Sequence, residues 1–216
     1  MFNYCPPLDI QDLKSTTFPD GKRYYSLPDG TRLPSVTTVI GAKGKEAILK
    51  WRAKVGEEVA NKISKQATSR GTNLHTICEN YLNNDPKYLL KVMPDALQMF
   101  KSIKPLLNRI NNIHYQEQAL WSVGIGMAGR VDCIAEFDGK LSIIDFKTRK
   151  PSSRGKFNVY DEDCLQLSAY READALALPR ADSCLSIIIN SQEPGIHIHR
   201  WSDDEVAHSW ECFALL

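Results

Sequence analysis

Two aspartates and a lysine lie in a pair of apolar runs that are separated by a two-residue turn. Asp132 belongs to the first run, Asp145 and Lys147 belong to the second, and Asp138-Gly139 lies between them. Asp-Gly between apolar runs predicts a hairpin, because both residues of its tight turn need a positive φ. In that register Asp132 faces Asp145, and Lys147 points to the same side of the sheet.

These three charges predict metal-dependent hydrolysis of a phosphate ester. Two facing carboxylates repel each other, and a divalent cation such as Mg²⁺ or Mn²⁺ would remove the conflict, because carboxylate oxygens are its ligands. A bound ion activates water for attack on phosphorus, and Lys147 can position that water or stabilise developing charge. Glycosidases also use paired carboxylates, but they do not need the lysine. A purely structural Asp–Lys pair is the other alternative, and it would be costly to bury.

Four other residues could contribute to such a site. His75 lies one step from the apolar stripe of a predicted helix, and spacing alone favours a hydrogen bond to Glu79 over a metal site. Glu117 precedes the hairpin and fits a metal ligand or an outward strand residue equally well. Gln166 and Tyr170 are four residues apart on one predicted helix, so they face the same way and could reach the hairpin.

Two basic segments flank the acidic hairpin, although the net charge of the chain is only +1. Residues 43–70 contain eight basic and three acidic side chains, and residues 147–156 contain five basic side chains and no acid. This distribution suits a polyanion that must reach a metal ion. A solvated helix face and a soluble loop would give the same pattern.

The length and composition predict one sizeable α/β domain. The chain has 216 residues, and its hydrophobic content of 43% and charged content of 25% are ordinary for a globular protein. The six cysteines form no C-x-x-C pair, so we expect no disulfide framework and no zinc or iron–sulfur site. The N-terminus lacks signal-peptide and transit-peptide features, and no apolar run reaches membrane-spanning length. We therefore expect a protein of a bacterial or phage-infected cytoplasm rather than a mitochondrial one, with no membrane partner.

The order of predicted elements indicates a mixed central β-sheet that is flanked by helices, with an N-terminal helical region. Ser35 is the expected N-cap of a short helix that Gly41 and Gly44 would end, and Gly56 is an expected interruption. The predicted strands are residues 22–27, 31–33, 113–123, 130–137, 140–147, 183–190 and 196–200. The predicted helices are residues 36–40, 46–66, 69–82, 95–108, 161–178 and 203–216.

Four motifs together resemble those of RecB-like nucleases in the PD-(D/E)xK superfamily. They are R-G-x-x-x-H at residues 70–75, G-R-V-D at 129–132, I-D-F-K-T at 144–148 and Q-L-S-A-Y at 166–170. L-P-S-V-T-T-V-I-G at 33–41 is similar to the start of the branch that contains the mitochondrial genome maintenance exonuclease and related phage exonucleases. The resemblance implies a restriction-endonuclease-like core and Mg²⁺- or Mn²⁺-dependent cleavage of DNA.

The resemblance also assigns roles to individual residues. It implies metal ligands at His75, Asp132, Asp145 and the main-chain carbonyl of Phe146. It implies a catalytic role for Lys147 and supporting roles for Gln166 and Tyr170. The helices before the histidine motif would arch over single-stranded DNA, with residues 43–65 as the candidate. Some relatives hold an iron–sulfur cluster through four cysteines, but Cys164, Cys184 and Cys212 lack that close spacing, so none is expected.

We therefore expect a metal-dependent DNA exonuclease that acts on single strands or DNA ends. One nuclease domain would span residues 1–216, with a DNA-gripping part at 1–110 and a catalytic part at 111–216. A structure-specific or restriction-type endonuclease of the same fold and a non-catalytic DNA-binding module are the alternatives. Trp51 or Tyr160 would stack on bases, and basic side chains would hold phosphates. The candidate DNA-binding residues are Lys43, Lys45, Lys50, Trp51, Arg52, Lys54, Arg70, Arg149, Lys150 and Arg154.

Overall fold

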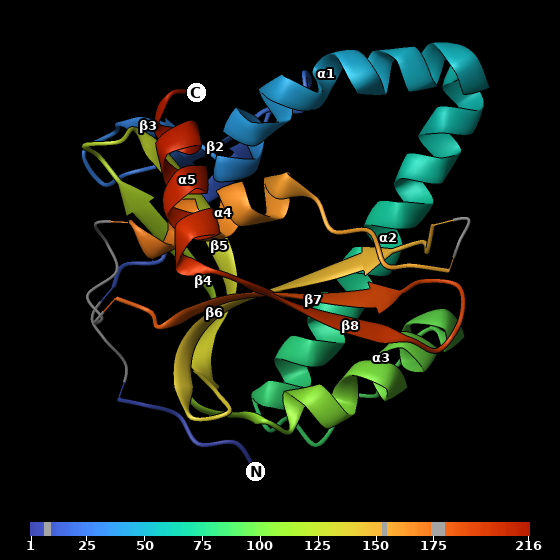
Figure 1. Cartoon of the computed structure of the whole chain (residues 1–216), viewed down its shortest axis with the longest axis vertical. Coiled ribbons are helices and arrows are strands. Elements are labelled where there is room, and N and C mark those ends of the chain that lie inside the picture. The colour runs from blue at the N-terminus through green and yellow to red at the C-terminus, as the bar shows by residue number, and fades with distance from the viewer. Residues whose placement is uncertain (7–9, 153–154, 174–179) are drawn as a thin grey trace.

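The computed structural model describes residues 1–6, 10–152, 155–173 and 180–216, without the side chain of Lys43, and its centre is a five-stranded sheet (Figure 1). The strand order is β4 (Ile110–Ser122), β5 (Met127–Phe137), β6 (Lys140–Arg149), β7 (Ser183–Asn190) and β8 (Ile196–Trp201). Strands β6 and β7 are parallel, and the other neighbours are antiparallel. The predicted mixed sheet is therefore confirmed.

Helices cover both faces of this sheet. The start of α1 (Val36–Val55) packs on one face together with α4 (Asp161–Arg171) and α5 (Asp203–Ala214). Helices α2 (Glu57–Leu82) and α3 (Pro94–Leu107) pack on the other face. Ile143 and Ile144 are consecutive on β6 and point into the two different cores. Two covered faces explain why the central strands are almost continuously apolar.

The hairpin of β5 and β6 forms as its sequence predicts. Asp138 and Gly139 make the turn with φ values of 54° and 75°. The register runs from Phe137–Lys140 to Cys133–Ile144, which is the predicted one. Strand pairing ends there, one residue before the two aspartates. The hairpin therefore delivers both acids at the point where its strands separate.

A small antiparallel sheet precedes α1. It consists of β1 (Ser15–Thr17), β2 (Arg23–Ser26) and β3 (Arg32–Pro34), of which β2 and β3 match the predicted hairpin and β1 was not predicted. The buried side chains of Tyr25 and Leu33 pack with Ala119 and Ala128 of the large sheet. The N-terminal segment is thus fixed against the edge of β4 and β5.

Helices α1 and α2 are longer than predicted. The Oγ atom of Ser35 caps α1 as expected, but Gly41 and Gly44 do not end the helix, because the helix-forming residues 45–54 continue it. It ends at Gly56, whose φ of 86° breaks the helix as predicted. Helix α2 then runs unbroken to Leu82, where two helices were predicted, because residues 67–68 include no helix breaker. In the described part of the chain, every helix is too short or too polar to span a lipid bilayer.

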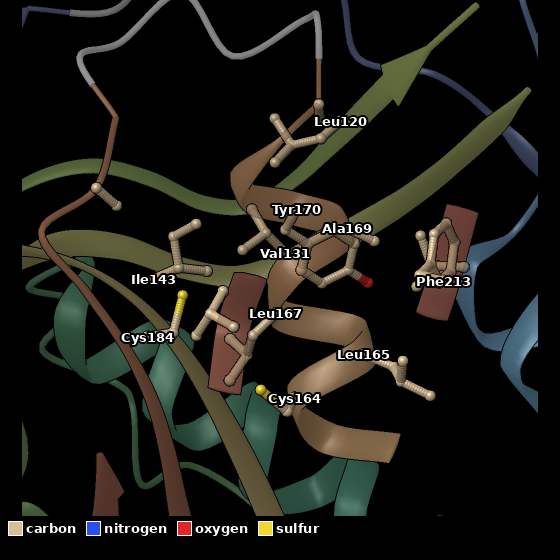
Figure 2. Close-up of a cluster of buried hydrophobic side chains, with 14 of the residues drawn as sticks. Leu120, Val131, Ile143, Cys164, Leu165, Leu167, Ala169, Tyr170, Cys184 and Phe213 are labelled. Carbon is tan, nitrogen blue, oxygen red and sulfur yellow. The ribbon is translucent and has the colours of Figure 1, made fainter. Parts of the chain in front are cut away.

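Helix α4 fixes the packing next to the hairpin. Figure 2 shows Leu167 and Tyr170 of α4 among Val131 and Ile143 of the sheet. A Cβ atom on Gly129 would lie 2.6 Å from the Tyr170 ring, so only glycine allows this approach. The helix ends at Arg171 rather than at the predicted residue 178, and residues 174–178 of that prediction lie outside the described part.

Candidate active site

A cavity of about 530 Å³ lies where α2, α4 and strands β4 to β6 meet. It collects side chains that are up to 147 residues apart in the sequence, from Arg23 on β2 to Tyr170 on α4. The candidate catalytic and metal-binding residues all line it: His75, Glu117, Asp132, Asp145, Phe146, Lys147, Gln166 and Tyr170. Their roles stay predictions, but the fold brings all of them to one place.

Three of these residues form a candidate metal centre. The Nδ1 atom of His75 lies 3.5 Å from Oδ1 of Asp132 and 3.7 Å from Oε1 of Glu117. One ligand atom from each residue lies within 4.8 Å of the other two. One nitrogen and two carboxylate oxygens are donors that suit Mn²⁺ and, with more oxygen ligands, Mg²⁺.

The ring orientation of His75 is fixed by the main chain of β6. Its Nε2 atom donates a hydrogen bond of 2.8 Å to the carbonyl oxygen of Phe146. This bond turns Nδ1 toward the carboxylates, as outer hydrogen bonds do for metal-binding histidines. The carbonyl of Phe146, predicted as a direct ligand, accepts this hydrogen bond and so supports a ligand candidate in the structure.

The charges of the centre also favour a cation. The pKa of Asp132 is raised to about 7, chiefly by burial and in part by the charge of Asp145, against the lowering effect of His75. Burial would lower the pKa of His75, but Asp132 and the other carboxylates raise it to about 9. The proton on His75 therefore balances crowded acids, and a metal ion would take the place of that positive charge.

Asp145 lies beside this centre and is held by other partners. The Nζ atom of Lys147 lies 3.0 and 2.7 Å from the two oxygens of Asp145, and 2.9 Å from Oε1 of Gln166. Gln166 in turn donates to Asp145 (3.0 Å) and to the hydroxyl of Tyr170 (3.3 Å). Burial would lower the pKa of Lys147, but Asp145, Asp132 and Asp163 together outweigh it and raise the pKa. Lys147 is thus a fixed cation and a hydrogen-bond donor rather than a base.

The two aspartates do not meet as a strand pair. Oδ2 of Asp132 accepts a hydrogen bond of 2.8 Å from the main-chain N–H of Phe146. This bond replaces the next rung of the ladder, because the strands separate after Cys133 and Ile144. Asp132 therefore turns toward His75, whereas Asp145 stays with Lys147.

Glu117 has a backbone conformation that the sequence did not indicate. Its φ of 47° lies in the left-handed region, in the middle of β4. The pairs Gln116–Cys133 and Gln118–Val131 flank it, so it lies opposite Asp132. A left-handed residue other than glycine costs roughly 1–3 kcal/mol, and such strain is concentrated at functional sites. This geometry favours the metal-ligand interpretation of Glu117 over that of an ordinary strand residue.

Most of the candidate DNA-binding residues lie outside the cavity. Lys45, Lys50, Trp51, Arg52 and Lys54 belong to the far half of α1, which Figure 1 shows running away from the sheet before α2 returns to it. We call residues 45–65, around the Gly56 bend, the arm. Exposed apolar side chains accompany the basic ones on the arm: Ile48, Leu49, Val59 and Ile63. Lys50 pairs with Glu46 (2.7 Å), and Arg52 pairs with Glu57 (2.5 Å).

The other candidates are divided between protein contacts and solvent. Arg149 is bound to Asp163 (2.5 Å), and its guanidinium lies 4.4 Å from the centre of the Tyr160 ring. Arg70 is half-buried, and Lys150 is exposed. The side chain of Lys43 and all of Arg154 lie outside the described part of the chain. Arg149 and Tyr160 therefore contact each other in the structure, where DNA contacts were predicted for both.

The sequence analysis missed several residues of the cavity. Arg23, Tyr25, Ser35 and Thr37 reach it from the N-terminal segment, and Thr72, Thr76, Glu79, Arg130 and Thr148 complete its wall. Arg130 and Thr148 stand next to catalytic candidates in the motifs, which was a usable signal. Ser35 and Thr37 belong to the stretch at 33–41 that resembles a nuclease branch. Arg23 and Tyr25 carried no such signal, because only the packing of the small sheet brings them here.

Comparison with known proteins gives one family and several distant relatives. Residues 45–182 match the model of the PD-(D/E)XK nuclease superfamily. Mitochondrial genome maintenance exonuclease 1 from Homo sapiens is 28% identical over 65% of this chain and 43% of its own length, and the Mus musculus protein is 25% identical over 65% and 44%. The chain thus matches less than half of these relatives. A crystal structure of a provisionally assigned exonuclease from Eubacterium rectale aligns with this chain at 13% identity and a TM-score of 0.49. The alignment covers 69% of this chain and 64% of that chain.

Proposed function

This chain belongs to the PD-(D/E)XK nuclease superfamily, and we propose on that premise that it is a metal-dependent exonuclease acting on single-stranded DNA or DNA ends. The observation that carries the proposal is the cluster of His75, Glu117 and Asp132 beside Lys147 in one cavity. The distant similarity to two proteins named as exonucleases supports this choice over an endonuclease.

His75, Glu117 and Asp132 would hold Mg²⁺ or Mn²⁺, with Asp145 within reach of the same cavity. The ion supplies Lewis acidity and lowers the pKa of a bound water molecule. The hydrogen bond from His75 to Phe146 presents Nδ1 to the centre. The N–H of Phe146 fixes one oxygen of Asp132 and leaves the other facing His75. The chain thus orients its ligand candidates before substrate arrives.

Lys147 would stabilise the negative charge that develops on the phosphate. Its ammonium is held by Asp145 and Gln166, and a raised pKa keeps it protonated. A compact cation that is fixed before the reaction costs little reorganisation when charge develops. Gln166 acts as a positioning residue, because it bonds both Lys147 and Asp145. Tyr170 supports Gln166 from the adjacent turn of α4.

The test is digestion of single strands labelled at the 5′ or the 3′ end, matching duplexes and a single-stranded circle, with Mg²⁺, Mn²⁺ or a chelator. We expect shortening from one end of linear DNA with either metal, no cleavage of the circle, and no activity with the chelator. Cleavage of the circle would indicate the endonuclease alternative. Tight DNA binding without any cleavage would indicate the non-catalytic binding module.

A further inference from the structure

Two arginines and one lysine line the cavity, and they differ in what they contact. Lys147 is held by Asp145 and Gln166. Arg130 donates to Asp12 (2.9 Å) and to the main-chain oxygen of Glu117. The guanidinium of Arg23 makes no ion pair or hydrogen bond with any residue in the described part of the chain. Arg23 is therefore the cation of this wall that remains available to a ligand.

The main chain of Arg23 is nevertheless fixed. Its N–H donates to Oγ1 of Thr38 (2.9 Å), and its carbonyl accepts from the N–H of Ser35 (2.8 Å). Both partners belong to the capped start of α1, which packs on the sheet through Val36. The base of the side chain is thus held at the cavity wall, while its charged end has no partner among the residues that the structure describes.

The position of Arg23 complements the charge of the rest of the cavity. The wall near the metal centre carries Glu79, Glu117, Asp132 and Asp145, which would repel DNA phosphates. A metal ion can offset this repulsion at the scissile phosphate only. A neighbouring phosphate of the same strand needs a separate cation, and an arginine fork matches phosphate geometry.

We propose that Arg23 binds a non-scissile phosphate of the DNA strand and so forms a substrate-holding subsite in the cavity. The inference rests on the proposed function and deepens it. Arg23 precedes residues 45–182, so the family match does not include this subsite. The hydroxyl of Thr37 lines the same cavity and can contribute a secondary hydrogen bond.

The test measures affinity without cleavage. In a Lys147→Ala background, Arg23→Ala should weaken binding of a fluorescent single-stranded oligonucleotide about tenfold by anisotropy. The slope of log affinity against log salt should fall by about 0.7, the value for one lost phosphate contact on a single strand. Arg32→Ala is the matched control, because Arg32 lies on β3 of the same small sheet and is exposed outside this cavity. Neither quantity should change in that variant.

A kinetic measurement in the otherwise wild-type protein separates holding from chemistry. Arg23→Ala should raise KM about tenfold and change kcat less than twofold, and Arg23→Lys should restore the salt slope. Melting curves check that both variants fold. An unchanged affinity in Arg23→Ala, or an equal loss in Arg32→Ala, would overturn the subsite while cleavage by the wild type upheld the proposed function. A wild-type protein that neither cleaves nor binds DNA would overturn both.

Discussion

Lys147 and the lysines of the arm belong to the two basic segments of the chain, yet they meet opposite surroundings. Lys147 is mostly buried and touches Asp145 and Gln166. Lys45 and Lys54 are exposed and make no ion pair within the described residues. Sequence composition makes the two segments look alike, and burial separates them.

The difference shows how a nuclease of this design would use buried cations for the reaction and exposed cations for attracting its substrate. A buried, partnered cation loses mobility and gains a defined position, which is what charge stabilisation at one atom requires. Exposed cations on a protruding helix attract a polyanion over several ångströms and lose this attraction as salt rises. The following substitutions test that division, from the largest expected effect to the smallest.

Lys147→Ala should have the largest effect. It removes the fixed cation, so turnover should fall at least about 100-fold, the loss typical of one preorganised donor. DNA affinity should change less than about threefold, because binding rests on many phosphate contacts. Cleavage rate and anisotropy measure the two quantities. Lys140→Ala, at the exposed other end of β6, is the control, and near-normal turnover of Lys147→Ala would contradict the role of the buried cation.

Asp132→Asn should remove most of the stabilisation by metal. At an Mn²⁺ concentration of about 100 Kd, binding stabilises the folded state by roughly 2.7 kcal/mol. For a chain of this size the increase in Tm is about 5–10 °C. Thermal melts with and without Mn²⁺ measure it. The exposed Asp204→Asn should keep the full increase. An increase that survives in Asp132→Asn would place the ion elsewhere.

Gly129→Ala tests the packing of α4 against β5, which positions the surroundings of the buried Lys147. The new methyl group would collide with the Tyr170 ring, so we expect a loss of about 1–3 kcal/mol in the free energy of unfolding. Denaturant melts measure it. Gly71→Ala is the control, because Gly71 lines the same cavity from helix α2. A Cβ atom there would lie 3.6 Å from Oγ1 of Thr148, which is an ordinary van der Waals distance. Equal destabilisation of the two variants would argue against close packing at Gly129.

The double variant Lys45→Ala/Lys54→Ala tests the exposed lysines of the arm and should have the smallest effect. Affinity for single-stranded DNA should fall about fivefold at low salt, and the salt slope should fall by about 1.4, twice the value for one contact. The melting temperature should not change. Lys101→Ala, on the exposed face of α3, is the control. An unchanged salt slope would exclude the arm from the DNA-binding surface.

Local chemistry made the centre of the fold predictable. Asp138-Gly139 determined the turn and the register of β5 and β6, because a two-residue turn leaves only one pairing. The acidic first turn of α4 and the Gly56 break were also local signals. The four motifs identified the superfamily, and the match of residues 45–182 to its family model confirms it.

Other features depend on tertiary contacts and could not be predicted in this way. The continuity of α1 across Gly41 and Gly44 results from the residues that follow them, which outweigh two unfavourable positions. The proximity of Glu117 to His75 needs a left-handed residue within β4, for which the sequence carried no glycine signal. The entry of Arg23 into the cavity follows from packing of the small sheet on Ala119 and Ala128.

Helix α2 connects the arm with the candidate metal centre, because it is one continuous helix from Glu57 to Leu82. One end carries part of the arm, and His75 lies about 27 Å from Glu57 at 1.5 Å per residue. The helix thus joins the arm, which would contact the DNA strand, to His75, which would bind the metal ion. If DNA binding to the arm tilts α2, the affinity of the site at His75 for the metal ion changes. Metal binding then changes the affinity of the protein for DNA by the same factor.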